Sequence, residues 1–148
     1  MLLPTPQQYH RILTMKMFTV EQANRTLPLL RRIVADIVAT YPRWQERVTE
    51  IELLAGVSTA TNPDARLEPL EREAQSLAAE IAGYIREIED VGAEYRMPAD
   101  AGLVDFPGEI GGRRVFLCWK LGEHAVEYWH DVDAGFAGRQ PLIPQTVA

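Results

Sequence analysis

The chain has 148 residues, of which 47% are hydrophobic and 24% are charged, a balance that is typical of a single globular domain. Its net charge of −6 provides no overall cationic field, which disfavours nucleic acids and anionic membrane surfaces as partners. The single cysteine cannot close an intramolecular disulfide, and no apolar run reaches the roughly 18 residues that span a bilayer, so we expect a soluble cytoplasmic protein.

Residues 1–16 are predicted to be an N-terminal arm outside the folded domain. They contain Pro4 and Pro6, and they lack the basic segment, the long apolar core and the small-residue cleavage site of a secretory signal. The regular pattern starts directly after Met17. We therefore expect residues 17–148 to form one α+β domain, in which 17–92 are a helical hairpin and 93–148 are a β segment with an ordered tail.

A capping box predicts where the first helix begins. In Thr19-Val20-Glu21-Gln22 the Thr19 hydroxyl can accept the backbone N–H of Gln22, whose side chain can reach back to the cap. From Val20 to Ile51 apolar residues then recur at alternating steps of three and four, which is the heptad stripe of a coiled-coil-like helix.

A second helix is predicted from a similar stripe between Leu67 and Val91. The small and turn-forming residues of Gly56–Asp64 form the connection, and Gly92 is placed as a helix stop. Pro28 and Pro42 interrupt the first stripe without changing its register, so kinks are expected there.

Several apolar positions lie outside the two stripes, and two slender helices cannot bury them alone. They are Leu29, Ile33, Val38, Leu53 and Ile85. The C-terminal β segment or a second copy of the chain must cover them. We therefore expect a homodimer that pairs the hairpins of two chains into a four-helix arrangement.

The residues after Gly92 are typical of short strands. Extended segments are predicted at Ala93–Met97 and Leu103–Phe106, followed by a turn region at Pro107–Gly112. Arg114–Leu121 and Ala125–His130 then form a predicted β-hairpin around the two-residue turn Gly122-Glu123.

This hairpin register assigns the side chains to two faces. It sets Leu121 opposite His124, and so places His130 and Tyr128 on one face with Val115, Leu117 and Trp119. The opposite face holds Phe116, Cys118, Glu127 and Trp129, which makes Cys118 and Glu127 neighbours. A carboxylate beside a thiol raises the thiol pKa, so we expect Cys118 to be packed and unreactive.

The densest group of potential metal ligands is His130-Asp131-Val132-Asp133, at the end of the last strand. A neutral imidazole with carboxylates suits a divalent ion such as Zn²⁺, Mn²⁺ or Fe²⁺. The alternative is a solvated strand end with a hydrogen-bonded structural histidine. Glu127 and His130 also match the Glu-x-x-His spacing of helical di-metal sites, but on a strand residues three apart point to opposite faces.

Two further residues are candidates for ligand binding. Asp105 interrupts the apolar run Leu103–Pro107, where a carboxylate must find a partner; it either serves a site or pairs with Arg113 or Arg114. Arg139 follows a segment with two glycines and offers a planar fork for a small anion. The alternative is that Phe136 anchors the tail in the core while Arg139 pairs with Asp131 or Asp133.

Four motifs, in this order along the chain, resemble the bacterial family catalogued as domain of unknown function 2203. They are Phe18–Asn24, Gly102–Pro107, Leu117–Glu123 and the stretch that combines Tyr128–His130 with Asp133–Leu142. The resemblance covers residues 17–142 and implies no activity or ligand. It does imply that the polar tail motif is a feature of the family.

Two functions follow as hypotheses, and enzymatic activity stays open in both. In the first, the protein binds a divalent metal or a small ligand at the end of the β-hairpin, through Asp105, Glu127, His130, Asp131, Asp133 and Arg139. In the second, it is a non-catalytic interaction module whose helical hairpin binds itself or a partner helix.

Overall fold

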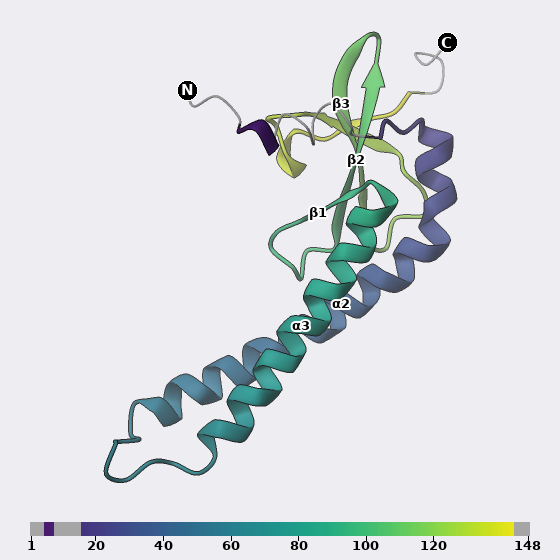
Figure 1. The fold of residues 1–148 in the computed structure, drawn as a ribbon. Coiled ribbons are helices and arrows are strands. Elements are labelled where there is room, and N and C mark those ends of the chain that lie inside the picture. Colours follow the sequence, from purple (N-terminus) through teal and green to yellow (C-terminus); the bar gives the residue numbers. More distant parts are fainter. Residues whose placement is uncertain (1–4, 8–15, 144–148) are drawn as a thin grey trace.

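The computed structural model describes residues 5–7 and 16–143, which contain two long helices followed by a five-stranded antiparallel sheet (Figure 1). The predicted α+β class is confirmed. The predicted arm, residues 1–16, lies outside the described residues except for 5–7 and 16. The elements are α2 (Val20–Ala55), α3 (Leu67–Val91), β1 (Glu94–Arg96), β2 (Leu103–Ile110), β3 (Arg113–Lys120), β4 (Tyr128–Asp131), the short 3₁₀ helix η1 (Phe136–Gly138) and β5 (Gln140–Pro141).

Helix α2 begins at the predicted capping box. The Gln22 N–H donates to the Thr19 hydroxyl at 3.1 Å, and the Thr19 N–H donates to the Gln22 side chain at 3.0 Å. Together these bonds satisfy two backbone donors that a helix N-terminus leaves free. Pro28 and Pro42 lie inside α2, which continues through both.

Helix α3 ends at the predicted stop. Gly92 adopts a left-handed backbone with φ of 102°, and its N–H donates to the carbonyl of Glu89 at 2.9 Å. Glycine is the residue that takes this conformation without a steric penalty. The chain then turns directly into β1.

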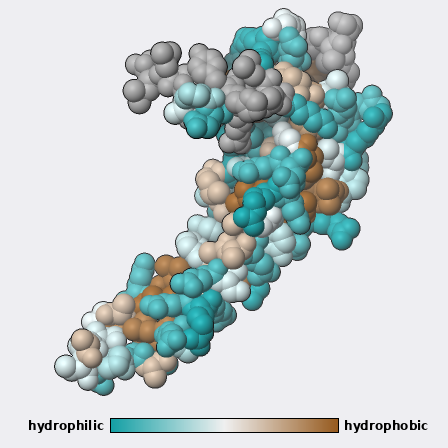
Figure 2. All heavy atoms as spheres, in the orientation of Figure 1, coloured by the Kyte–Doolittle hydropathy of each residue, from teal (hydrophilic) through white to brown (hydrophobic). Residues whose placement is uncertain are grey.

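The two helices form a hairpin that extends from the sheet (Figure 1). Its fully buried residues lie between Ala23 and Thr40 of α2 and between Ala74 and Ile88 of α3. In the distal half, residues 41–55 and 67–73 are at most half-buried. Figure 2 shows hydrophobic surface on this distal half. Within the part of the chain that the structure describes, no helix is apolar over a length that would cross a membrane.

The sheet has the strand order β1-β2-β3-β4-β5, so every strand pairs with its neighbour in sequence. Alternate residues of β2 and β3 join the helices in one core, among them Val104, Phe106, Leu117 and Trp119. Because successive side chains of a strand point to opposite faces, Asp105 and Cys118 belong to the face turned away from that core. The candidate site lies there.

Strand β2 is longer than the sequence predicted. We expected a turn region at Pro107–Gly112, but β2 continues through Pro107 to Ile110 and pairs Pro107 with Phe116 of β3. Proline is tolerated here because β1 has already ended and the Pro107 carbonyl accepts from the N–H of Phe18 at 2.7 Å. Pro107 therefore needs no N–H on that edge of β2.

The predicted β3–β4 register is wrong by one residue. Phe116 pairs with His130 and Leu117 pairs with Trp129, whereas the two-residue turn would have set Leu117 opposite Tyr128. This shift moves His130 to the face of Phe116 and Cys118, since one residue of slip reverses every side chain of a strand.

The cause is a longer connection between β3 and β4, formed by residues 121–127. The Lys120 N–H donates to the Glu123 carboxylate at 2.7 Å, which closes a turn at the end of β3. Val126 is drawn away from the sheet, because its N–H donates to the Asn24 side chain of α2 at 2.7 Å. The chain rejoins the sheet only at Tyr128.

The tail after β4 turns back along the sheet. Gln140 and Pro141 of β5 pair with Trp129 and Tyr128 of β4. Phe136 is 45% exposed, so the expectation that it anchors the tail in the core is wrong. Residues 144–148 lie outside the described part of the chain.

Candidate metal site

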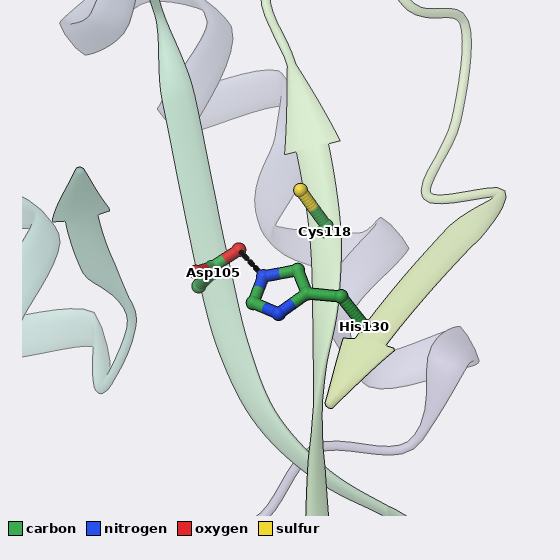
Figure 3. A group of neighbouring side chains, drawn as sticks. All are labelled: Asp105, Cys118 and His130. Atoms are coloured by element: carbon green, nitrogen blue, oxygen red, sulfur yellow. Dashed lines mark hydrogen bonds and ion pairs between the residues drawn. The ribbon is translucent and has the colours of Figure 1, made fainter. Parts of the chain in front are cut away.

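Three adjacent strands bring three different side chains together (Figure 3). Asp105 comes from β2, Cys118 from β3 and His130 from β4. Asp105 pairs directly with Cys118, and His130 pairs with Phe116, two residues from Cys118 on the same face. The sheet register alone therefore fixes this triad of Asp105, Cys118 and His130.

The triad is compact and buried. One carboxylate oxygen, the thiol sulfur and one imidazole nitrogen all lie within 4.8 Å of one another. The three residues are 2%, 1% and 2% exposed, in the same order. A carboxylate, a thiol and an imidazole are the side chains that bind transition metals, and they stand here at the spacing of a coordination site.

The hydrogen bonds of His130 fix its protonation pattern. Its Nδ1 lies 2.7 Å from the carbonyl oxygen of Asp131, and since a carbonyl only accepts, Nδ1 carries a proton. Its Nε2 lies 2.9 Å from Oδ1 of Asp105, so one further proton is shared between these two atoms. Both ring nitrogens are occupied, and the imidazole has no free lone pair with which to act as a general base.

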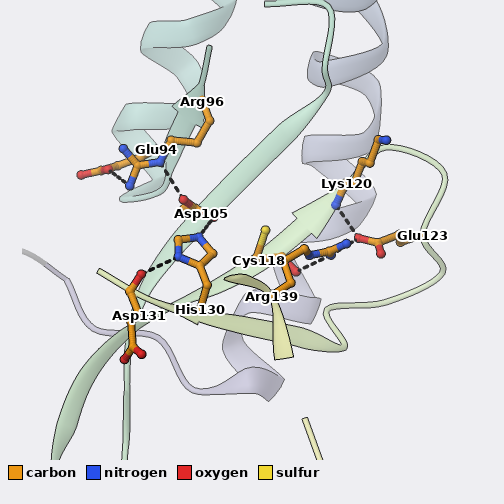
Figure 4. A network of polar contacts seen from close by, with 9 residues as sticks. All are labelled: Glu94, Arg96, Asp105, Cys118, Lys120, Glu123, His130, Asp131 and Arg139. Carbon is orange, nitrogen blue, oxygen red and sulfur yellow. Dashed lines mark hydrogen bonds and ion pairs between the residues drawn. The ribbon is translucent and has the colours of Figure 1, made fainter. Parts of the chain in front are cut away.

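Arg96 holds the second oxygen of Asp105 (Figure 4). Its Nε donates to Asp105 Oδ2 at 2.6 Å, and its Nη2 pairs with Glu94 at 2.9 Å. The guanidinium also stacks on the Phe116 ring, 4.7 Å from the centroid. The expected pairing of Asp105 with Arg113 or Arg114 is wrong, because its partners are Arg96 and His130.

Cys118 keeps its proton in the absence of a metal. Burial raises the pKa of its thiol to about 12, and the neighbouring Asp105 carboxylate acts in the same direction. A thiol with such a pKa is a poor nucleophile at neutral pH. The raised pKa agrees with the unreactive thiol that we expected. The neighbouring carboxylate is Asp105 and not Glu127, because Cys118 pairs with Tyr128.

The triad forms part of the lining of a pocket of about 320 Å³. The other lining residues are Arg96 of β1, Met97 directly after it, Leu103 of β2, and Val132, Asp133, Gly135 and Phe136 of the tail. A ligand in this pocket would contact the triad. The triad is thus buried within the protein and reachable from one side.

The structure separates the predicted metal ligands. His130 belongs to the triad, and Asp133 lines the same pocket. The Asp131 carboxylate instead forms an ion pair with Arg113, while its backbone carbonyl orients His130. Asp131 therefore acts on the triad through its main chain.

Of the other two predicted ligand-binding residues, Glu127 is exposed outside the triad, whereas Arg139 lies beside Cys118 and donates to its backbone carbonyl at 3.3 Å. The Glu127 backbone carbonyl accepts from the Leu142 N–H at 2.8 Å. Arg139 is 12% exposed at its side chain, pairs with Glu123 at 2.5 Å and stacks on Tyr128 at 4.0 Å. Its expected pairing with Asp131 or Asp133 is wrong, because its partner is Glu123. Its Nε is buried without a hydrogen-bond partner among the described residues.

Sequence reasoning missed Cys118 as a partner of His130, and it missed Arg96 entirely. The signal for Cys118 was present in the alternation along β2 and β3, which puts Asp105 and Cys118 on one face. No sequence signal identified Arg96, because its role depends on the pairing of Glu94 with Asp105 across β1 and β2.

Comparison with known proteins yields one family. A model of a family described as uncharacterized conserved protein, DUF2203, matches residues 16–142. Neither the curated proteins nor the solved structures contain a match to the chain.

Proposed function

The chain belongs to the DUF2203 family, whose description names no activity, and we propose that its function is to bind a divalent transition metal ion through Asp105, Cys118 and His130. The observation that carries this proposal is the convergence of oxygen, sulfur and nitrogen ligand atoms within 4.8 Å in a buried site. Acid–base catalysis and thiol chemistry fit the same residues poorly, because both imidazole nitrogens are occupied and burial raises the pKa of the thiol to about 12.

The charges of the site support a metal ion. Without metal, one proton lies between His130 and Asp105 and a second lies on the Cys118 sulfur. A divalent ion that replaces both protons leaves a neutral imidazole, a carboxylate and a thiolate, which are the forms that bind metals. The exchange conserves the total charge, so it adds no unpaired charge to a buried site.

The surrounding hydrogen bonds also support it. The Asp131 carbonyl accepts from Nδ1 of His130 and turns Nε2 toward the other ligands. Arg96 holds Oδ2 of Asp105 and leaves Oδ1 for the metal. Such outer contacts orient metal ligands and raise affinity, typically by 10–100-fold.

The donor set favours zinc among divalent metals. Thiolate and imidazole ligands suit Zn²⁺, whereas Mn²⁺ prefers oxygen ligands, and Fe²⁺ stands between them. Three protein ligands leave one tetrahedral position to a water molecule or to a molecule from the pocket. The proposed site therefore has the ligand count of a catalytic or transport site and not that of a closed structural one.

Metal analysis of untagged protein tests the proposal. We expect about one equivalent of Zn²⁺ per chain after dialysis against Zn²⁺ and removal of the excess, and saturable binding in calorimetry. Cys118→Ala and His130→Gln should each weaken binding by about 100-fold or more. His124→Gln, which changes an exposed histidine in the 121–127 connection, is the matched control and should bind as the wild type does. Wild-type protein that shows neither stoichiometric metal nor saturable binding contradicts the proposal.

A second function, self-association through the hairpin tip, is supported by the surface of the distal half. Leu53 and Val57 are 70% and 72% exposed. Beside them lies a groove of about 590 Å³ whose apolar residues are Leu53, Leu54, Pro69 and Leu70. Together with the heptad stripe, this surface suits the matching surface of a second copy. The two functions are compatible, because the metal site lies on the sheet.

A further inference from the structure

From the pocket in front of the triad we infer that the open metal position binds a small uncharged molecule, which coordinates through a lone pair and lays an apolar part against the pocket wall. This inference rests on the proposed metal site and specifies its ligand class. The pocket has a volume of about 320 Å³, which is at the lower end of the roughly 300–1,000 Å³ that small-molecule pockets occupy.

The direction of the open position follows from the arrangement of the ligands. Asp105, Cys118 and His130 rise from one face of the sheet and also line the pocket. The sheet therefore lies beneath the metal position, and the pocket lies in front of it. A fourth ligand would approach from the pocket.

Four apolar residues line the outer wall beside its polar groups. Leu103 extends from β2, Met97 follows β1, and Val132 and Phe136 belong to the tail. Met97, Val132 and Phe136 are 66%, 53% and 45% exposed, which is a large exposure for side chains of this kind. A ligand with an apolar part would cover them and remove that surface from water.

The charges of the pocket select against anions. The Nε of Arg96 donates to Asp105 and its Nη2 pairs with Glu94, so this edge of the guanidinium is already taken and is not free to bind a carboxylate or phosphate. The exposed Asp133 carboxylate lines the pocket, and among residues 16–143 no ion pair neutralises it. With a divalent ion bound, Asp105 and the Cys118 thiolate balance the ion and Arg96 balances Glu94, so Asp133 adds about one negative charge to this group of residues.

Cations are excluded for a different reason. A protonated amine has no lone pair to offer the metal, and it would be repelled by the ion itself. The remaining candidates for the open metal position are uncharged electron-pair donors such as an azole or a neutral amine. The pocket thus combines a Lewis-acid centre, an apolar wall and one acidic group at its rim.

The tail holds this wall in place. Gly135, at φ 64° and ψ −166°, has a backbone conformation that is accessible almost only to glycine, and it sets the turn between Asp133 and Phe136. Arg139 stacks on Phe136 at 4.9 Å and bonds the Cys118 carbonyl at 3.3 Å. The polar tail motif therefore builds the wall of the pocket while Arg139 ties it to the strand of the thiol ligand.

Titrations of the Co²⁺-loaded protein test the inference, because the visible absorption of Co²⁺ changes when its fourth ligand changes. The probes at pH 8 are imidazole, 4-phenylimidazole and azide. We expect saturable spectral changes with imidazole, binding of 4-phenylimidazole at least about threefold tighter because its ring buries apolar wall, and weak binding of azide.

Two variants distinguish the effect of a charge inside the pocket on ligand affinity from the effect of the net charge of the protein. Asp133→Asn should tighten azide binding by about threefold or more and leave imidazole binding within about twofold. Asp90→Asn makes the same chemical change on the exposed end of α3, outside the pocket lining, and should leave both affinities as in the wild type.

The outcomes distinguish the inference from the metal proposal. If Co²⁺ does not bind, or binds equally well to Cys118→Ala, the metal site itself is refuted and the inference with it. If Co²⁺ binds through Cys118 but no probe alters its spectrum, the metal site stands and the open position is refuted. A preference for azide over imidazole in wild-type protein, or a loss of affinity on adding the phenyl ring, overturns the assigned ligand class.

Discussion

His130 and Asp105 are 25 positions apart in the sequence, yet Nε2 of the histidine lies 2.9 Å from Oδ1 of the aspartate in the buried face of the sheet. Each residue is 2% exposed, so neither can exchange this partner for water. Loss of this contact should therefore affect both the stability of the sheet and the proposed metal site.

Loss of the imidazole should destabilise the metal-free protein. His130→Ala leaves Asp105 buried with Arg96 alone, and an unsatisfied buried acceptor costs about 1–3 kcal/mol. Urea denaturation at pH 7 in the presence of a chelator measures the change in the free energy of unfolding. His124→Ala, in an exposed position, should stay within about 0.5 kcal/mol of the wild type. Equal stability of the two variants would contradict the structural role of His130.

Alkaline pH should weaken the fold through Cys118. The folded protein retains the thiol proton up to a pKa of about 12, whereas the unfolded chain releases it near the usual value of 9.0. The folded state therefore binds more protons between these values, and stability is lost as pH rises from 9 toward 12.

The measurement is the difference in stability between wild type and Cys118→Ala, both metal-free, at pH 8 and pH 10. We expect the wild type to lose about 1 kcal/mol relative to the variant over this interval. Tyr95, whose pKa burial also raises to about 12 from 10.0, contributes little below pH 10 and is common to both proteins. A pH-independent difference would show that the thiol ionises normally.

Metal binding should release protons. Zn²⁺ displaces the proton of Cys118, so the thiol releases about one proton per ion at neutral pH. Calorimetric titrations in buffers of different ionisation enthalpy count the released protons. In Cys118→Ala, binding should weaken and the released number should fall by about one. Release that is the same in both proteins would remove the thiol from the ligand set.

The capping box should contribute to global stability. Thr19→Ala removes the acceptor for the Gln22 N–H and should cost about 1 kcal/mol of unfolding free energy. Thr19→Ser retains a hydroxyl at the same position and should cost much less. Thermal denaturation of the three proteins under one condition compares them, and equal midpoints would contradict the assigned cap.

The hairpin tip should control the oligomeric state. Leu53→Glu puts a charge on an exposed apolar position beside the tip groove, and should convert a dimer into a monomer without loss of helix content. Light scattering at micromolar concentration reads the mass, and circular dichroism reads the helix content. Glu52→Gln, at the adjacent exposed position, should keep the mass of the wild type. A monomeric wild type would end the self-association proposal.

The helices were predictable because their signals are local. The capping residues Thr19 and Gln22, the three-and-four spacing of apolar residues and the stop at Gly92 all act within a few residues of the structure they determine. The hairpin therefore agrees with the sequence to its ends. The α+β order of the chain followed from the change of pattern after Gly92.

The site was only partly predictable, because it depends on register. His130 and Asp105 were identified as chemically unusual residues, but the face of His130 was wrong. The error came from Gly122-Glu123, which has the appearance of a two-residue turn. The longer connection includes a contact between distant segments, the bond from the Val126 N–H to Asn24 of α2, which no local pattern reveals.

In the distal half of the hairpin, residues 41–55 and 67–73 include no fully buried side chain. We therefore expect this half to tolerate a change of length. Removal or insertion of seven residues in each helix keeps the apolar stripes in phase and moves the tip by roughly 10 Å, while the strands that carry Asp105, Cys118 and His130 keep their register. Such changes would alter the reach of the hairpin and leave the proposed metal site unchanged.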